Sequence, residues 1–196
     1  DENPALSCPN PAVSYSADSG LCSAALDFSV TPTDNCGVAS TVYSVNGSAI
    51  TYPYDFPVGT TTVDILVTDI HDNTSDCSID VVVTDDENPA FSCPTPAASY
   101  TADSGLCSAA LDFTVSPTDN CDVASTVYSV NGSEITYPYD FPVGTTTVDI
   151  LVTDIHNNTS ECSFDVVVTD DEDPAFSCPT PETSYTADSG LCSAAL

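Results

Sequence analysis

The chain has 196 residues with 30 acidic side chains, no Lys and no Arg, which gives a formal net charge of −30. This charge repels the phosphates of nucleic acids and anionic membrane surfaces, so we expect neither a nucleic acid partner nor membrane binding. No run of 18 apolar residues is present, so we also expect no membrane insertion.

The composition nevertheless favours a folded protein. Hydrophobic residues make up 41% of the chain, which is too many for a disordered segment. Ten Cys recur at regular positions, as expected for a disulfide framework in an oxidising compartment. Because basic side chains are absent, the fold has to rest on apolar burial, backbone pairing and disulfides.

An internal repeat of 85 residues organises the chain. Cys8, Cys93 and Cys178 follow one another at this interval, and residues 1–85 align with 86–170 without a gap, with 74 of 85 positions identical. This period is about the size of one small sandwich domain. We therefore predict two complete domains, 1–85 and 86–170, and the first strands of an incomplete third repeat, 171–196.

Within one repeat, alternating apolar and polar residues predict β-strands. The alternation covers 26–30, 63–67 (with a lapse at Leu66) and 79–83, and no segment has helical periodicity. Asn46-Gly47 predicts a tight hairpin, and further turn signals occur at 18–20, 32–35 and 56–59. About seven short strands per repeat indicate an all-β protein of tandem immunoglobulin-like β-sandwich domains, about 85 residues each and stapled by disulfides.

Five sequence motifs, in this order in both repeats, resemble the hyalin repeat (HYR) family. They are Cys8-Pro9, Gly20-Leu21-Cys22, Pro32-Thr33-Asp34-Asn35-Cys36, Phe56-Pro57-Val58-Gly59-Thr60-Thr61-Thr62-Val63 and Cys77-Ser78-Ile79-Asp80-Val81-Val82-Val83. The segment Asp69-Ile70-His71-Asp72-Asn73 departs from the family, which usually has Gly before the Asn. The resemblance implies an immunoglobulin-like extracellular module linked to adhesion and surface structures, without catalytic residues.

The four Cys of each repeat are candidates for disulfides or for zinc ligands. They contain no Cys-x-x-Cys pair, which disfavours zinc. In an immunoglobulin-like sandwich the first and last strands are neighbours, which favours Cys8–Cys77 and leaves Cys22–Cys36. The equivalent pairs predicted in the second repeat are Cys93–Cys162 and Cys107–Cys121.

The acidic junction between repeats is a candidate calcium site. Asp85, Asp86 and Glu87 precede a Pro in an arrangement that loosely resembles the calcium-rigidified linkers of cadherins. Calcium takes six to eight oxygen ligands, and Asp34 or Asp69 from adjoining loops is expected to complete the set. The alternative is a solvated linker, in which case the protein requires no cofactor.

Covalent glycans are expected as well. N-glycosylation sequons fall in predicted turns, and their acceptor residues are Asn46, Asn73, Asn131, Asn157 and Asn158.

No catalytic constellation is apparent, and we predict that the protein is not an enzyme. His71 and His156 occupy equivalent turn positions, as expected of exposed residues. The aromatic cluster 52–56 is interpreted as core packing, with a sugar-stacking or domain-contact surface as the alternative.

The leading functional hypothesis is a structural segment of a secreted stalk or extracellular filament at the cell surface, whose partner is itself in a head-to-tail array. The alternative is an adhesin-type module that binds carbohydrate or protein. Residues 171–196 stop within a predicted strand, which favours a window on a longer array over donation of strands to a neighbouring subunit.

Overall fold

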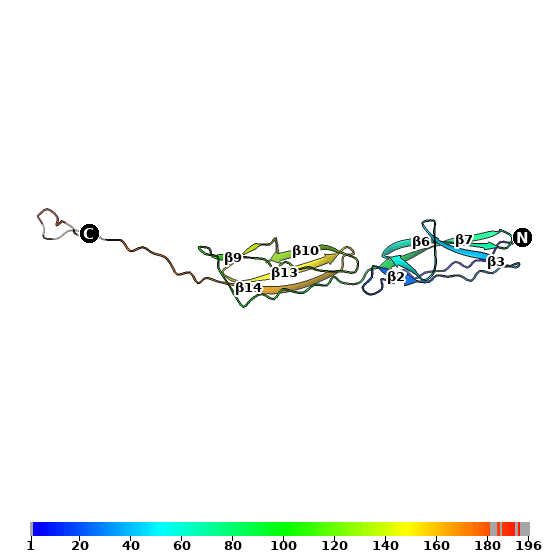
Figure 1. Cartoon of the computed structure of the whole chain (residues 1–196), viewed down its shortest axis with the longest axis horizontal. Coiled ribbons are helices and arrows are strands. Elements are labelled where there is room, and N and C mark those ends of the chain that lie inside the picture. The colour runs from blue at the N-terminus through cyan, green and yellow to red at the C-terminus, as the bar shows by residue number, and fades with distance from the viewer. Residues whose placement is uncertain (1, 181–183, 185, 191, 193–196) are drawn as a thin grey trace.

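The computed structural model describes residues 2–180, 184, 186–190 and 192, so part of the predicted third repeat lies outside the described residues. Two β-sandwiches lie end to end along the long axis, and the chain continues beyond the second one as an extended segment (Figure 1). In this described part of the chain, no helix has the length and apolar character needed to cross a membrane.

Each sandwich contains seven strands. Those of the first are β1 (Tyr15–Ser16), β2 (Ser23–Leu26), β3 (Val38–Val45), β4 (Ser48–Ile50), β5 (Tyr54–Pro57), β6 (Gly59–Asp69) and β7 (Thr74–Thr84). Those of the second are β8 (Tyr100–Thr101), β9 (Ser108–Leu111), β10 (Val123–Val130), β11 (Ser133–Ile135), β12 (Tyr139–Pro142), β13 (Gly144–Asp154) and β14 (Thr159–Thr169).

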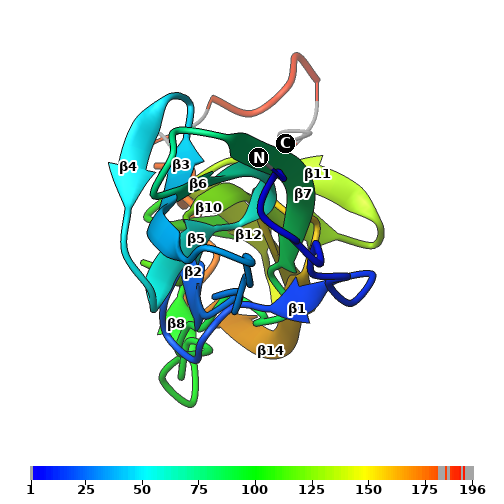
Figure 2. The ribbon, with the colours of Figure 1, turned by 90° about the vertical axis from the view of Figure 1, so that its right-hand side faces the viewer.

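The two sandwiches have the same topology. In the first, a five-stranded sheet with the order β1-β7-β6-β3-β4 faces a two-stranded sheet of β2 and β5. In the second, the orders are β11-β10-β13-β14-β8 and β12-β9. Seen along the long axis, β4 and its equivalent β11 lie on opposite sides, so the second sandwich is turned about this axis relative to the first (Figure 2).

The core follows from alternation along the two longest strands. On β6, Val63, Ile65 and Val67 are fully buried, and β7 contributes further inward side chains. Leu66, where the sequence alternation lapses, is 43% exposed, so it faces outward as its position in the strand requires. Phe56 on β5 closes the core from the smaller sheet.

On the outward face of this sheet, hydroxyl–carboxylate hydrogen bonds link neighbouring strands, since the chain has no Lys or Arg to form salt bridges. Thr62 on β6 donates to Asp80 directly opposite on β7, and Ser78 donates to Asp64, each over 2.6 Å. Cross-strand pairs of this kind stabilise a sheet without any basic side chain.

The predicted hairpin and the turn that departs from the family both contain left-handed residues. Asn46 and Gly47 have φ values of 50° and 74° and connect β3 to β4, as a two-residue hairpin requires. In the turn between β6 and β7, Asp72 has a φ of 68°, so a residue that tolerates this region stands where the family usually has Gly.

One strand prediction is wrong in its bounds. The strand lies at Ser23–Leu26, and residues 27–30 form no strand. Phe28 and Val30 still pack against the core, which explains their alternation in the sequence. The buried residue of the actual strand is Ala24, a weak hydrophobic signal.

Candidate functional site at the domain junction

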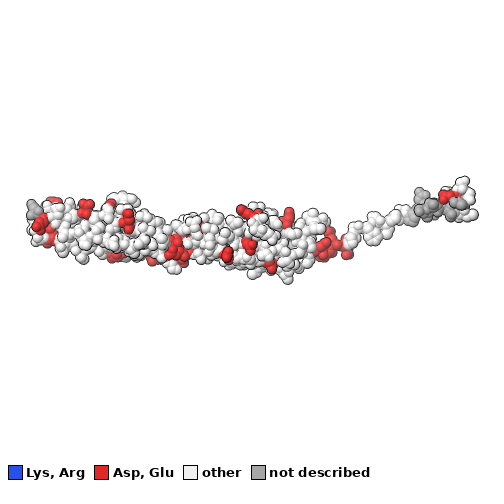
Figure 3. Space-filling model, turned by 180° about the vertical axis from the view of Figure 1, so that it is seen from behind, with Lys and Arg blue, Asp and Glu red and all other residues white. Residues whose placement is uncertain are grey.

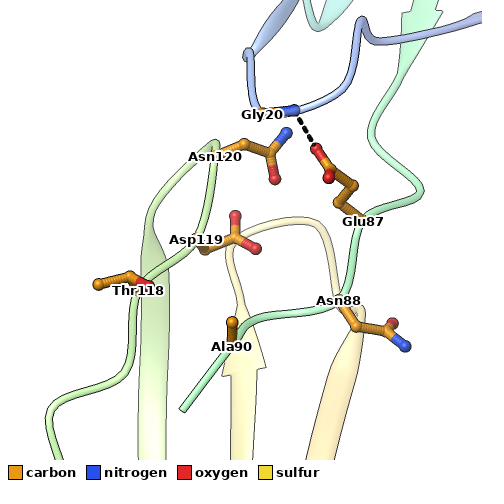
Figure 4. A pocket seen from close by; sticks show the side chains of 7 residues that line it. All are labelled: Gly20, Glu87, Asn88, Ala90, Thr118, Asp119 and Asn120. Carbon is orange, nitrogen blue, oxygen red and sulfur yellow. Dashed lines mark hydrogen bonds between the residues drawn. The ribbon is translucent and has the colours of Figure 1, made fainter.

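The sandwiches meet where a linker and three loops converge. The linker leaves β7 at Asp85. The first sandwich contributes the turn 18–22, and the second contributes the loop 118–122 before β10 and the turn 155–158 between β13 and β14. Figure 4 shows Gly20 of the first sandwich bonded to the linker residue Glu87, with Asn120 of the second sandwich beside them.

Two disulfides lie within single sandwiches. The structure joins Cys8 to Cys77 and Cys93 to Cys162, which is the pairing that the sequence favours for these four residues. In each case a loop segment before the first strand is tied to one of the long strands, β7 or β14.

The third disulfide crosses the junction and corrects the other predicted pairs. Cys22 of the first sandwich is bonded to Cys121 of the second, with 4.8 Å between their Cα atoms. The predicted bridges Cys22–Cys36 and Cys107–Cys121 are therefore wrong. Cys36 and Cys107 are both exposed and unpaired.

The length of the sandwich explains why Cys22 and Cys36 do not pair. The carbonyl of Cys22 accepts a hydrogen bond from Val58, just before β6 begins. The carbonyl of Gly37, next to Cys36, accepts one from Ile70, just after β6 ends. An 11-residue strand therefore separates the two Cys, and it spans ~35 Å, whereas a disulfide requires Cα atoms within about 7 Å.

A buried polar network centred on Asp85 accompanies the bridge. Asp85 as a whole residue is 7% exposed, and its side chain is fully buried. Its carboxylate accepts a hydrogen bond of 3.0 Å from the side-chain amide of Asn120 and lies 3.2 Å from Nδ1 of His156. Asn120 also donates to the carbonyl of Leu21 over 2.9 Å, which ties the second sandwich to the turn that holds Cys22. Asn158 donates to the Asp85 carbonyl over 3.1 Å.

Three carboxylates converge within this network. Asp85, Asp119 and Asp154 each offer one oxygen, and these oxygens lie within 4.8 Å of one another. Oδ2 of Asp119 and Oδ1 of Asn120 are buried atoms without a hydrogen-bond partner in the described residues. Such a group of oxygens has the chemistry of a hard cation site, because calcium prefers carboxylate and carbonyl oxygens. The Cys121 sulfur is also near, but its disulfide prevents it from acting as a thiolate ligand.

Hydrogen bonds keep one of these carboxylates ionised. Burial by itself raises the pKa of Asp154, but hydrogen bonds from the side chain and backbone of Asn158 and from the backbone of His156 outweigh it, so the pKa lies below its ordinary value. In the equivalent turn of the first repeat, the hydrogen bond from the Asn73 side chain likewise holds the pKa of Asp69 below its ordinary value.

The predicted calcium ligands do not gather as one set. Asp34 and Asp69 lie at the far end of β6 from Asp85, and it is their equivalents in the following repeat, Asp119 and Asp154, that join Asp85. The remaining predicted ligands, Asp86 and Glu87, accept hydrogen bonds from the surface of the first sandwich instead. Asp86 accepts a hydrogen bond from Ser16, and Glu87 accepts one from the Gly20 backbone over 2.6 Å.

Beside the network, the junction is hollowed. A depression of about 250 Å³ lies between Gly20, Glu87 and Asn120 (Figure 4). On the face shown in Figure 3, acidic side chains occur along both sandwiches, and they gather at the junction and at the end of the second sandwich.

The structure separates the sequon residues into two groups. Asn46, Asn131 and Asn157 are exposed. The side-chain nitrogens of Asn73 and Asn158 instead donate to the carboxylates of Asp69 and Asp154, over 2.8 and 2.7 Å.

The junction residues Asn120, Cys121 and His156 were not predicted as one site. Sequence reasoning kept each contact within one repeat and treated His156 as an exposed turn residue. The 85-residue offset was the available signal, since these residues recur as Asn35, Cys36 and His71.

Comparison with protein families decides what the repeat is. Residues 84–168 match the HYR domain along the whole length of one repeat. This segment is an HYR domain. The first repeat is identical to the second at 74 of 85 positions and has the same strand order.

Several solved structures match the chain at low similarity. The fibronectin(III)-like modules of Clostridium thermocellum CbhA are 14% identical, with a TM-score of 0.37, and the match covers 88% of this chain and 99% of that one. Human protocadherin-24 EC1-2 is 16% identical, with a TM-score of 0.32 and coverage of 82% and 95%. Drosophila N-cadherin EC1-3 is 10% identical, with a TM-score of 0.31 and coverage of 87% and 68%. No curated protein sequence matches the chain.

The HYR assignment of residues 84–168 places this segment among extracellular immunoglobulin-like repeat domains, and its disulfide is consistent with that location. HYR domains resemble adhesive and structural modules without catalytic activity, and no catalytic family matches the chain.

Proposed function

We propose that the chain is a structural segment of a secreted surface stalk or extracellular filament, in which HYR repeats follow one another head to tail. The observation that carries this proposal is the Cys22–Cys121 bridge between neighbouring domains. A covalent bond beside the linker restricts hinge motion and gives tension a second covalent path across the junction. Domains joined by a single flexible linker have neither property.

The buried junction supports the same function. Asp85 is nearly inaccessible and binds side chains of the next domain, so separating the domains would leave a buried carboxylate without its partners. The near-identity of the two repeats also favours a scaffold, because a filament needs the same junction at every step. An 11-residue strand plus loops corresponds to a rise of roughly 35–45 Å per repeat.

Calcium at the junction and glycans on the turns belong to this proposal. Asp85, Asp119 and Asp154 would supply carboxylate oxygens to calcium, and binding there would stiffen the contact between domains. Asn46, Asn131 and Asn157 are the acceptors that an N-glycan can reach without breaking a hydrogen bond to Asp69 or Asp154.

A carbohydrate-binding adhesin is the competing function. The aromatic residues 52–56, which would stack on a sugar, pack against the core instead. Phe56 is fully buried, and the Tyr52 ring packs 4.8 Å from that of Tyr43. Burial, followed by charge repulsion from Tyr43 and Asp27, raises the pKa of Tyr52 to about 12. These rings support core packing as the role of residues 52–56.

Electron microscopy of the secreted protein, purified without reductant, tests the proposal. We expect thin, unbranched fibres or stalks with a periodicity of roughly 35–45 Å along their length. Reduction is expected to make the same objects bend more freely at that spacing. Compact particles without a repeating axial spacing would contradict the structural role, and binding of these particles to a glycan array would favour the adhesin.

A further inference from the structure

The two unpaired Cys near the sandwich ends are the counterparts of the two that form the bridge. Cys36 is equivalent to Cys121, and Cys107 is equivalent to Cys22, each at an offset of 85 residues. The bridge therefore joins position 22 of one repeat to position 36 of the next. Cys36 lies on the end of the first sandwich that faces away from the junction, and Cys107 lies on the outer end of the second.

The loop that carries Cys107 has the same conformation as the bridged loop that carries Cys22. In the bridged loop, Asp18 donates its N–H to the Ser23 carbonyl over 2.8 Å, and in the free loop Asp103 donates to Ser108 over the same distance. The carbonyls of Cys22 and Cys107 accept hydrogen bonds of 3.1 and 3.0 Å from the residues just before β6 and β13. The free thiol is thus held in position before any partner arrives.

The linker beyond the second sandwich also has the conformation of the linker at the junction. Glu172 accepts hydrogen bonds from the Gly105 backbone over 2.7 Å and from the Ser104 hydroxyl over 3.1 Å. Glu87 binds Gly20 and Ser19 in the same way at the junction. The outer end of the second sandwich is therefore a prepared docking face for another repeat.

The outer end of the first sandwich carries the complementary face. Oδ1 of Asp34 accepts the Cys36 N–H over 2.8 Å, as Oδ1 of Asp119 accepts the Cys121 N–H over 2.8 Å. Oδ2 of Asp34 is buried without a hydrogen-bond partner, as is Oδ2 of Asp119 at the junction. The two equivalent Cys differ mainly in solvent exposure: Cys36 is exposed, whereas Cys121 is only 6% exposed at the junction.

We propose that these two faces bind further HYR repeats covalently. Cys107 forms a disulfide with the position-36 Cys of a complete repeat that follows, and Cys36 forms one with the position-22 Cys of a repeat that precedes. Each bond forms by thiol–disulfide exchange with an oxidised disulfide donor. Two thiols lose two protons and two electrons, the new S–S bond forms, and the donor is reduced to two thiols. The array then carries one covalent staple at every junction.

This inference rests on the head-to-tail array of the proposed function, and disulfide mapping of the secreted protein tests it. Free thiols are alkylated without prior reduction, and the protein is digested with pepsin at acid pH, where disulfides exchange slowly because thiolate is scarce. The near-identical repeats remain distinguishable. Ser29 differs from Thr114 on the position-22 peptides, and Gly37 differs from Asp122 on the position-36 peptides.

We expect the peptide that contains Cys22 and Ser29 to be linked to the peptide that contains Cys121 and Asp122. The peptide that contains Cys107 and Thr114 should be linked to a position-36 peptide, and neither Cys36 nor Cys107 should be alkylated. A Cys22 peptide linked to a Cys36 peptide, or alkylated Cys107 in an intact array, would overturn the inference.

A variant and a second readout keep the two proposals separate. Cys107→Ser leaves the Cys93–Cys162 bridge in place, and it should expose one additional alkylated thiol, at position 36 of the following repeat. No additional thiol would contradict the bond. Micrographs of the same material report on the proposed function: fibres with free thiols overturn only this inference, whereas bridged repeats in compact particles overturn only the filament.

Discussion

Asn158 of the second sandwich donates a hydrogen bond of 3.1 Å from its side-chain nitrogen to the backbone carbonyl of Asp85, at the end of the first sandwich. The same nitrogen donates to Asp154 over 2.7 Å. A residue that the sequence presents as a glycan acceptor therefore holds the junction together. Asn157, its neighbour in an overlapping sequon, is exposed.

Glycans should be attached to the exposed Asn side chains and not to those that are hydrogen-bonded to an Asp carboxylate. Asn46→Gln is expected to lower the mass of the secreted protein by one glycan, because the Asn46 side chain is exposed in the β3–β4 turn. Asn158→Gln is the matched control and should leave the mass of attached sugar unchanged. It preserves the sequon of Asn157, and the nitrogen that it replaces is already engaged in two hydrogen bonds. Intact-mass measurement before and after deglycosylation distinguishes the variants, and a glycan lost in Asn158→Gln would refute the division.

Removal of the Cys22–Cys121 disulfide should lower the stability of the protein, whereas the same substitution at the equivalent Cys36 should not. We expect Cys121→Ser to lower the free energy of unfolding by about 2–4 kcal/mol, because the bridge closes a long loop in the unfolded chain. In the 196-residue chain expressed by itself, Cys36→Ser changes the same position of the first repeat, where the thiol is exposed and has no preceding repeat to bond. That variant should stay within about 0.5 kcal/mol of the wild type.

Chemical denaturation measures both variants, and small-angle scattering adds a readout of shape. The maximum dimension of Cys121→Ser should spread over a wider range as the junction bends, while that of Cys36→Ser should not. Equal losses of stability in the two variants would show that the bridge has no special contribution.

The sequence predicted the sandwich because burial has a period of two on the long strands. Val63, Ile65 and Val67 alternate with outward residues, and the hairpin at Asn46 follows from the backbone freedom of Asn-Gly. The short strand around Ala24 escaped prediction because Ala and Ser give little hydrophobic contrast. Its position is set by pairing with Phe56 on β5 rather than by local pattern.

The junction was predicted in part. The acidic linker pointed to Asp85, but the partners come from the next repeat, where Asp119 and Asp154 stand at the offsets of Asp34 and Asp69. No local pattern distinguishes Cys36 from Cys121 as the partner of Cys22, because both follow Asp-Asn. Only the distance between the ends of the sandwich decides the pairing.

Ionised Asp154 should make the junction sensitive to acid. Its hydrogen bonds lower its pKa in the folded state below the unfolded-state value of about 3.9. The ionised carboxylate therefore contributes stability above about pH 4, and this contribution is lost as pH falls through the folded-state pKa. Asp154→Asn should be less stable than the wild type at neutral pH, and the difference should shrink progressively below about pH 4.

A charge-matched variant isolates this effect from the general repulsion among 30 acidic residues. Asp140→Asn removes one exposed negative charge on β12. It should show no comparable loss at neutral pH. Thermal unfolding of the three proteins between about pH 2 and 7 makes the comparison. A difference between wild type and Asp154→Asn that stays constant with pH would contradict the assigned ionisation.

Calcium should bind the oxygens that converge at the junction. Asp85, Asp119 and Asp154 lie close together in a chain with no Lys or Arg to offset their charge. We expect calcium to raise the melting temperature, since a ligand at 100 times its Kd stabilises the folded state by about 2.7 kcal/mol. Asp119→Asn should lose most of this shift, because it removes a carboxylate whose Oδ2 is buried without a partner.

In the 196-residue chain expressed by itself, Asp34→Asn is the matched control for this variant, since it makes the same change in the first repeat, away from the junction between the two sandwiches. It should retain the calcium shift. Magnesium chloride at equal concentration reports general screening of the acidic surface, because magnesium requires a stricter octahedral site and gives up its water reluctantly. Small-angle scattering with and without a chelator should then show a narrower range of maximum dimensions with calcium in the wild type only, not in Asp119→Asn. If calcium and magnesium shift all three proteins equally, the carboxylates only keep the array soluble and the junction owes its stiffness to Cys22–Cys121 and the hydrogen bonds around Asp85.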